Sequence, residues 1–236
     1  QLAAQHKLFC KCPIAKSDEV LLEVKRKLRV VAGELGEYDP AALYEFLRGK
    51  VFNYKINKYT SCLVELDDDP PREINGEALA TVLQICKLLN CKILDEIYVM
   101  RKTVIDGSSV SGFQRTALVG LDGGIETLSG NISIGMICIE EDSAPAITKE
   151  AGIVEYRLAR SGIPLVEIAT GPDMHSPEQT KEVAERIGLL LRSVSVVRGI
   201  GSIRQDINIS IAGGERIEIK GFQELERIPQ AVENEV

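Results

Sequence analysis

Residues 201–210, GSIRQDINIS, and residues 213–221, GGERIEIKG, form the stretch that decides the fold. In each, isoleucines alternate with polar side chains, which is the period of a β-strand with one buried face. The connection at Ala212–Gly214 contains glycine, which readily adopts the left-handed conformation that a three-residue hairpin loop needs. The two stretches therefore predict an antiparallel hairpin.

The register of this hairpin follows from the cost of burying charge. A two-residue turn would put the charged side chains of the second strand on the apolar face of the first, which is expensive. A three-residue loop instead pairs Asn208 with Glu218 and Asp206 with Lys220. Asp206 and Glu218 then become diagonal neighbours, with Cα atoms roughly 7 to 8 Å apart. Such a carboxylate pair suits a divalent cation, but a solvated face with cross-strand ion pairs gives the same pattern.

The segments around the hairpin mix helices and strands without the strict alternation of a doubly wound sheet. Ser176, Pro177 and Gln179 form a helix-start signal for a helix over 177–193. This organisation predicts an α+β fold with a mostly antiparallel sheet and flanking helices. Further helices are predicted at 17–33, 40–48, 76–90 and from about 223, and strands at 51–56, 61–66, 94–105, 113–120, 130–141 and 162–170.

The composition narrows the classes of protein. The chain has 236 residues and a net charge of −7, which argues against a surface that coats nucleic acid. No apolar run approaches the roughly 18 residues that a membrane-spanning helix needs, and no signal peptide is evident. Six cysteines without a CxxC pair are typical of a reducing compartment. We therefore expect a cytoplasmic protein with no membrane partner, truncated at both ends because it lacks an initiator methionine and stops within a helical pattern.

Two other strand patterns carry acids that need an explanation. Glu141 shares a strand face with isoleucines, and Glu167 lies inside the apolar stretch PLVEIAT. An ionisable side chain in such a place needs a partner or a ligand. With Asp206 and Glu218 these make four acids on separate strands. A cation site with bound phosphates would explain all four, whereas solvated strand ends and structural ion pairs would explain each alone.

A zinc site is a second candidate. Cys10 and Cys12, in the sequence CKCP, supply at most half of it, because structural zinc takes about four ligands. Cys62, His6 and His175 are the further candidates, and nothing in the sequence selects among them.

These same residues carry a resemblance to a known family. The segments HKLFCKCP (6–13), LVELDDDPP (63–71), VMRKTVIDGSSVSGFQRTALVG (99–120), YRLARSGIPLVEIATGPDMHSPEQ (156–179) and the hairpin resemble the E subunits of archaeal glutamyl-tRNA(Gln) amidotransferases, with the B subunits as the sister group. The resemblance implies one cradle-shaped catalytic domain over residues 1–236, incomplete at both ends, without the inserted and C-terminal domains that bind tRNA.

The resemblance also implies an activity. The γ-phosphate of ATP would pass to the glutamate side chain of Glu-tRNA(Gln), and ammonia would then displace phosphate to give Gln-tRNA(Gln). ATP and Mg²⁺ are the implied cofactors. The implied partner is an asparaginase-like glutaminase, the D subunit, in a heterotetramer. Two alternatives remain open: a B-type chain of the amidotransferase that has three kinds of subunit, and a non-catalytic α+β scaffold that binds RNA or a partner.

Site residues follow from the resemblance, position by position. The CKCP segment resembles the place where some B subunits carry zinc. The implied metal ligands are Glu141, Glu167, Asp206 and Glu218; the implied catalytic residues are Gln114, Lys102 and Arg160; and the implied nucleotide contacts are Arg204 and Lys220.

Overall fold

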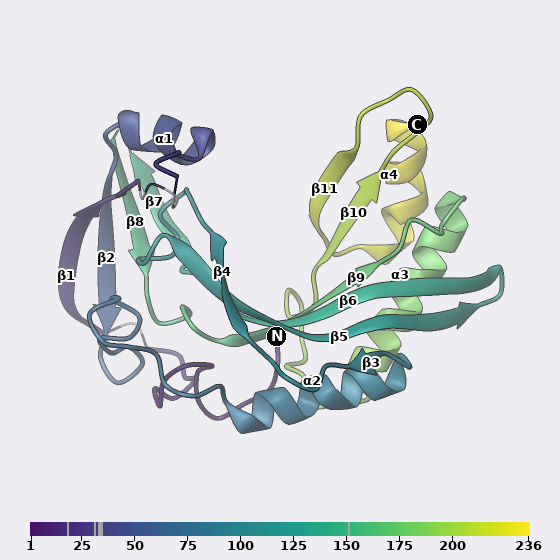
Figure 1. Ribbon diagram of the computed structural model, residues 1–236, viewed down its shortest axis with the longest axis horizontal. Helices are drawn as coiled ribbons and strands as arrows, with labels where there is room; N and C mark the ends of the chain where they lie inside the picture. The colour runs from purple at the N-terminus through teal and green to yellow at the C-terminus, as the bar shows by residue number, and fades with distance from the viewer. Residues whose placement is uncertain (18, 31, 33–34, 151) are drawn as a thin grey trace.

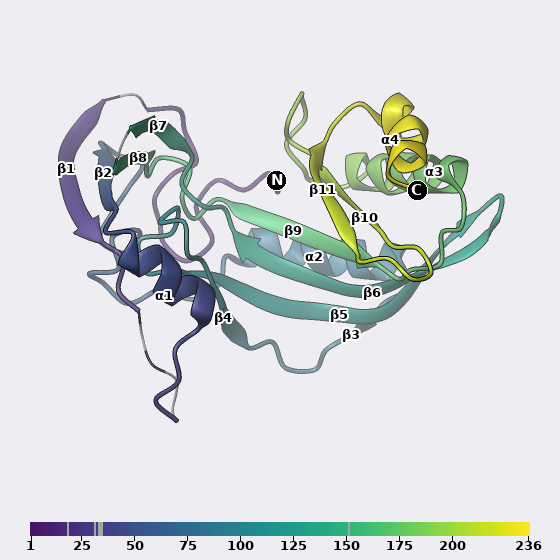
Figure 2. The same cartoon turned by 90° about the horizontal axis from the view of Figure 1, so that it is seen from above.

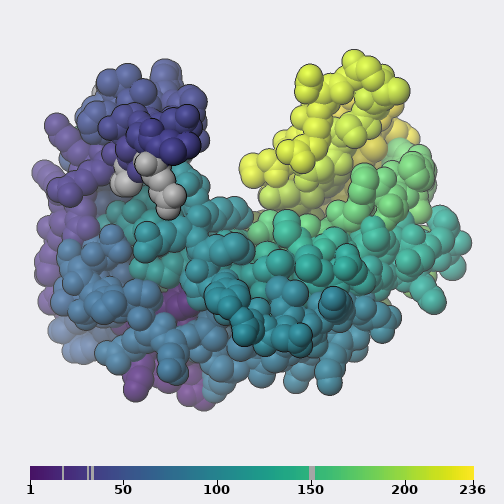
Figure 3. Space-filling model, in the orientation of Figure 1, coloured from purple at the N-terminus to yellow at the C-terminus, as the bar shows by residue number. Residues whose placement is uncertain are grey.

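A computed structural model describes residues 1–17, 19–30, 32, 35–150 and 152–236. The chain forms a cradle in which two arms rise from a common sheet (Figure 1). The space between the arms is hollow when side chains are drawn in full (Figure 3). We call the common sheet the floor, the arm that carries α1 the small-sheet arm, and the arm that carries β10 and β11 the hairpin arm.

The elements confirm the predicted α+β class. The helices are α1 (Pro40–Leu47), α2 (Gly76–Leu88), α3 (Pro177–Arg192) and α4 (Ile228–Glu235), with the 3₁₀ turn η1 (Leu225–Arg227) before α4. The strands are β1 (Val20–Lys27), β2 (Val51–Asn57), β3 (Lys92–Ile93), β4 (Val99–Thr103), β5 (Phe113–Thr127), β6 (Gly130–Glu141), β7 (Ala146–Glu150), β8 (Ile153–Arg157), β9 (Pro164–Thr170), β10 (Gln205–Ile209) and β11 (Ile217–Phe222).

The floor is an antiparallel sheet built around two long strands. β5 has 15 residues and β6 has 12, and they pair along most of their length. β9 pairs with the other edge of β6, while β3 and β4 pair with β5. The view from above shows β9, β6 and β5 side by side, with the hairpin on the β9 side (Figure 2). The floor thus reaches from one arm to the other.

A hydrophobic core lies under the floor. Ala117, Ile137 and Ile139 point away from the hollow and pack with Val82 and Ile85 of α2. Each of these side chains is fully buried, and burying a large aliphatic side chain stabilises the fold by about 1.5–3 kcal/mol. Helix α2 begins where expected, because the Asn75 side chain accepts hydrogen bonds from the first-turn amides.

Gly123 allows β5 and the residues at the end of α2 to approach closely. A Cβ at Gly123 would lie 2.3 Å from the Cys91 sulfur and 2.6 Å from the Leu89 carbonyl oxygen. Any side chain at this position would therefore push the end of the helix away from the floor.

The small-sheet arm has a core of its own. Its strands follow the order β1-β2-β8-β7, with β2 and β8 parallel, so the sheets are mostly rather than wholly antiparallel. In this core the rings of Tyr54 and Tyr156 stack, and Phe52 packs against both at a tilt. The hydroxyls of Tyr54 and Tyr156 donate to the carbonyl oxygens of Gly107 and Asp106, at 2.7 and 2.6 Å. These bonds hold the glycine- and serine-rich loop after β4 against the arm.

The hairpin arm is a third packing unit. β10 and β11 form a two-stranded sheet, and their inward isoleucines pack with Ala184 of α3 and Ile228 of α4. The pair Asn208–Glu218 confirms one of the two predicted pairs, whereas a register shift between Gln205 and Ile207 removes the predicted Asp206–Lys220 pair. The ladder ends at Ile209 and Ile217, so the connection spans 210–216 rather than three residues.

Two predicted elements were wrong. The helix predicted at 17–33 contains strand β1, although residues 18, 31, 33 and 34 lie outside the described part of the chain. Pairing with β2 overrides the helical spacing: Val24 and Leu28 pack inward, and Leu21 is exposed. The strand predicted at 61–66 is a series of turns instead.

Those turns bring an acid to a buried lysine. Glu65 Oε1 lies 3.2 Å from Lys7 Nζ, and the two side chains are 4% and 0% exposed. Lys7 also donates to the Leu158 carbonyl oxygen at 3.1 Å, and the Cys62 amide donates to Glu65 at 2.7 Å. This pair joins the N-terminal segment to the turns and to the small-sheet arm.

We expect Glu65→Gln to lower the free energy of unfolding at pH 7 by about 3 kcal/mol, because it leaves a buried ammonium without its partner. Burial alone would raise the pKa of Glu65, but Lys7 and the bonds from Cys10 and Cys62 hold it below its ordinary value. A depressed carboxyl pKa contributes stability above the unfolded pKa that is lost as pH falls through the folded pKa. The difference between wild type and variant should therefore shrink from pH 7 to pH 3.

Urea denaturation followed by circular dichroism at both pH values measures this difference. Glu19→Gln is the matched control, because the Lys58–Glu19 pair is exposed and should contribute less than about 1 kcal/mol. A Glu65→Gln deficit that is the same at pH 7 and pH 3 would contradict the assignment.

Candidate functional site

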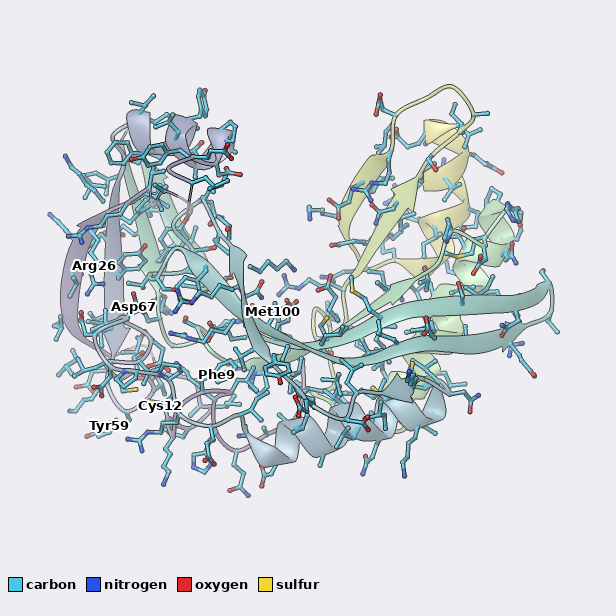
Figure 4. The ribbon with its side chains drawn as sticks, in the orientation of Figure 1. Phe9, Cys12, Arg26, Tyr59, Asp67 and Met100 are labelled. Atoms are coloured by element: carbon cyan, nitrogen blue, oxygen red, sulfur yellow. The ribbon has the colours of Figure 1, made fainter. Side chains whose placement is uncertain are left out.

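The hollow face of the floor gathers polar side chains from four strands. Cross-strand pairs share a face, so the pairs Lys102–Gln114, Thr116–Glu140 and Cys138–Glu167 fix which side chains meet there. The pairing places them together on the face opposite the core. Met100, two residues before Lys102 on β4, lies between the two arms on this face (Figure 4). The floor therefore presents a polar surface to the hollow.

Lys102 bridges two carboxylates on this surface. Its ammonium lies 3.4 Å from Glu140 Oε2 and 3.4 Å from Glu167 Oε2. The Glu140 side chain is 10% exposed, against 44% for Glu167 and 51% for Lys102. We call these three residues the floor cluster.

The floor cluster has an excess of negative charge. Burial raises the pKa of Glu140, the nearby Glu167 carboxylate raises it further, and Lys102 only partly compensates. The two carboxylates in turn raise the pKa of Lys102, against the effect of burial. Two carboxylates that share one lysine carry a net negative charge, so a further cation is attracted to them.

Glu141 does not join this cluster. Successive strand residues point to opposite faces, so Glu141 lies on the core side. Its carboxylate accepts hydrogen bonds from the Arg115 backbone amide at 2.9 Å and from the Arg115 guanidinium at 3.1 Å. It lines a small cavity that also contains Lys7 and Glu65. Burial raises the pKa of Glu141, and Arg115 partly offsets that effect.

The structure therefore brings Glu140, rather than the predicted Glu141, beside Glu167. The two-residue period of the strand shows from the sequence that Glu140 and Glu141 occupy opposite faces. It assigned Glu141 to the face of Ile137 and Ile139, and that face proved to be the core.

The hairpin arm carries a second pair of carboxylates with a lysine. Lys220 Nζ lies 3.1 Å from Glu218 and 4.0 Å from Asp206. A bulge between Gln205 and Ile207 replaces the predicted Asp206–Lys220 pairing, and Asp206 accepts a hydrogen bond from the Gly221 amide at 2.7 Å. All three side chains are exposed, and the hairpin stands above the β9 side of the floor (Figures 1 and 2).

The remaining predicted site residues are Gln114, Arg160 and Arg204. Gln114 donates to the Glu141 carbonyl oxygen at 2.6 Å, which fixes the end of β6. Arg160 is exposed and pairs with Asp142 at 2.8 Å, just beyond that end. Arg204 is exposed at the start of the hairpin. Residues 1–3 link strand β9 to the segment between α3 and the hairpin. The Leu2 amide donates to the Pro164 carbonyl oxygen of β9, and residues 1 and 3 form backbone hydrogen bonds with residues 197 and 195.

These carboxylates fit the ligand preference of Mg²⁺. Magnesium binds oxygen donors, commonly one or two carboxylates together with substrate phosphates and water. Glu140 and Glu167 already share one cationic group, and the pKa of Glu140 is raised first by burial and then by the neighbouring Glu167 carboxylate. The floor cluster is therefore a candidate site for a divalent cation, facing a hollow that could receive phosphate groups.

The comparison with known proteins now decides the family. Residues 1–236 match the model of the GatB/GatE catalytic domain. The chain belongs to the GatB/GatE family. Relatives named as the E subunit of glutamyl-tRNA(Gln) amidotransferase are 55% identical in Pyrococcus horikoshii, over 98% of this chain, and 53% identical in Saccharolobus solfataricus, over all of it.

The chain spans only 36–37% of the length of these GatB/GatE relatives. The relative from Pyrococcus furiosus, 54% identical over 98% of this chain, has the same name and a coverage of 37%. Among the described residues, no helix is long and apolar enough to cross a membrane.

This GatB/GatE domain also gathers a cysteine cluster. The sulfur atoms of Cys10, Cys12 and Cys62 and a carboxylate oxygen of Glu65 all lie within 4.8 Å of one another. His6 and His175 are not among these ligand atoms. Four donors at this separation fit a tetrahedral structural zinc, which these residues would hold and which would tie residues 10–12 to residues 62–65.

Two thiols of this cluster, those of Cys10 and Cys62, have raised pKa values. The pKa of Cys10 is raised, chiefly by its hydrogen bond with Cys12 and by burial, and burial raises the pKa of Cys62 to about 11. Zinc binding would therefore have to release the thiol protons, and its affinity should fall at acidic pH.

We expect the full-length protein, purified without chelator, to contain about one zinc ion per chain. Cys62→Ser should lose the metal and unfold at a lower temperature, as measured by mass spectrometry of metal content and by calorimetry. Cys91→Ser is the control, because Cys91 lies outside the cluster. Full zinc content in Cys62→Ser would contradict this assignment.

Proposed function

We propose that this domain activates the glutamate side chain of Glu-tRNA(Gln) with ATP and then amidates it with ammonia, giving Gln-tRNA(Gln). The observation that carries the proposal is the floor cluster, in which Glu140 and Glu167 share Lys102 at the base of the hollow. Membership of the GatB/GatE family supports it, as do the relatives' names.

Glu140 and Glu167 would hold Mg²⁺ in this proposal. The ion would neutralise charge on the transferred phosphate, which is its usual contribution to phosphoryl transfer. Asp206 and Glu218 of the hairpin arm are the second pair of proposed ligands. Glu141, implied by the family resemblance, is replaced by Glu140, because Glu141 is occupied by Arg115 on the core side.

Positive side chains would orient the two anionic substrates. Lys102 is proposed to contact the transferred phosphate, and Arg204 and Lys220 the remaining phosphates of ATP. All three side chains are exposed, and the hairpin borders the space between the arms (Figure 1). A carboxylate approaching ATP is repelled by its phosphates, and fixed cations lower that repulsion most in the transition state.

The reaction balances in two displacements. An oxygen of the substrate carboxylate bonds to the γ-phosphorus, and the bond between that phosphorus and the bridging oxygen breaks, so ADP leaves. The nitrogen of ammonia then bonds to the activated carbon, the carbon–oxygen bond to phosphate breaks, and the nitrogen loses a proton. Gln114 and Arg160 are proposed to position the end of β6 for these steps, since both bond to residues there.

The partners follow from the same proposal. In water at neutral pH, ammonia takes up a proton and becomes ammonium, which cannot attack carbon. We therefore propose that a glutaminase chain, the D subunit, delivers the ammonia directly. tRNA binding is assigned to segments outside this chain. Since the reaction serves protein synthesis, we propose a cytoplasmic location.

The proposal predicts different results for neighbouring acids. In the full-length protein with its partner, Glu140→Gln and Asp206→Ala should each reduce ATP-dependent phosphorylation of Glu-tRNA(Gln) by about a hundredfold or more. Glu-tRNA(Gln) should still bind, because neither residue is assigned to tRNA. Release of labelled phosphate from ATP and a filter-binding assay measure the two properties.

Glu141→Gln is the matched control for Glu140→Gln. It should chiefly lower the melting temperature, because it weakens the buried Arg115 contact. Normal phosphorylation in Glu140→Gln, with a large loss in a stably folded Glu141→Gln, would refute the reassignment. Normal phosphorylation in all the variants would favour the non-catalytic scaffold, whereas copurification with an amidase-family partner would favour the B type.

A further inference from the structure

Lys102 contacts two carboxylates at the same distance. Its ammonium is 3.4 Å from each of two carboxylate oxygens, whereas a charge-assisted N–H···O bond is typically about 2.7–2.9 Å long. Both contacts exceed this length equally, so the ammonium is shared between two partners. Neither carboxylate is therefore engaged at its best distance.

We propose that Lys102 is a displaceable counter-ion: its ammonium and a divalent cation compete for Glu140 and Glu167, and cation binding moves the ammonium into the hollow, toward the phosphate groups. This inference rests on the proposed function, because it assumes that the floor cluster binds a cation. It adds that the cluster couples metal binding to the position of a phosphate-binding lysine.

Charge favours exchange over joint occupancy. Two ionised carboxylates carry a charge of −2, which one lysine reduces to −1 and one divalent cation reduces to zero. A cation held by both Glu140 and Glu167 would lie within a few ångström of the present ammonium position. The cation and the ammonium would repel each other strongly at that separation, because burial lowers the local dielectric constant and the neighbouring Glu140 is buried. The ammonium should therefore leave when the cation arrives.

The side chain of Lys102 is free to make this move. It is 51% exposed and lies on β4, whose five residues are all exposed. Among the described residues its polar side-chain contacts are the two carboxylates alone. A lysine stem has four carbons and several rotatable bonds, so its ammonium can shift by several ångström without backbone movement.

Another lysine shows what a fixed counter-ion looks like. Lys7 is 0% exposed, lies 3.2 Å from Glu65 and also donates to the Leu158 carbonyl oxygen. A backbone acceptor and complete burial hold that ammonium in place. Lys102 has neither, although it also balances acids.

The first experiment measures Mn²⁺ binding to the full-length protein at pH 8, without ATP or tRNA, by electron paramagnetic resonance. Wild type, Lys102→Gln and the control Lys92→Gln are compared, and the Glu140→Gln/Glu167→Gln variant identifies binding at the floor cluster. Lys92 is exposed on β3 and lies outside the cluster. We expect Lys102→Gln to bind Mn²⁺ on the order of tenfold more tightly, because the competing charge is gone, and Lys92→Gln to match wild type.

Unchanged or weaker binding in Lys102→Gln would overturn this inference and leave the proposed function standing. Absence of any binding that depends on Glu140 and Glu167 would overturn both. The two failures are therefore distinguishable.

The second experiment needs no substitution. Wild-type protein is acetylated briefly with and without Mg²⁺, and modification of each lysine is quantified by mass spectrometry. Release from two carboxylates should make the Lys102 amine severalfold more reactive when Mg²⁺ is present, while the reactivity of Lys92 stays constant. Equal labelling of Lys102 in both conditions would overturn the proposal even if the variant of the first experiment folds poorly.

Discussion

The antiparallel pairing of β5 with β6 is the constraint on which the rest of the structure depends. These strands run the length of the floor, so their register decides which side chains face the hollow and which enter the core. The two-residue period then separates Glu140 from Glu141. A shift of one residue would exchange the acid of the floor cluster for the buried acid, and would turn Ile137 and Ile139 toward water.

Lysine–carboxylate contacts have different consequences in different surroundings. The Lys7–Glu65 pair is enclosed and satisfied by additional hydrogen bonds, so it serves as a structural joint. The floor cluster, and the group formed by Asp206, Glu218 and Lys220 on the hairpin, each contain two acids for one lysine. Burial makes an unbalanced carboxylate costly, and this applies to Glu140, whose side chain is 10% exposed; under the proposed function a bound cation would offset that cost. The same kinds of side chain thus join two segments in one place and form a candidate cation site in another.

Sequence reasoning recovered what local chemistry determines. The capped helix α3 and part of the hairpin register followed from Ser176, Pro177 and the alternation of isoleucines with charged residues. Strand β1 could not be recognised, because its hydrogen-bonded neighbour β2 lies far along the chain and overrides the helical spacing.

The candidate site was likewise predicted only where the local sequence pattern determines it. Glu167 was recognisable as an acid within an apolar strand, and its partner Glu140 was missed because adjacent acids differ only in the face that they occupy. The convergence of Cys62 and Glu65 with Cys10 depends on turns that the sequence pattern presented as a strand. Contacts that depend on the path of a loop therefore lay outside what periodicity can show.

The separate packing of the hairpin arm affects how the domain unfolds on heating. Within the described residues, β10 and β11 bond to each other and to no further strand, and their core is a small cluster with α3 and α4. Two-stranded sheets are marginal without such support. The arm can therefore open locally while the floor stays intact, before global unfolding. The lifetime of the intact fold at high temperature then depends on how well Ala184 and Ile228 pack against one hairpin.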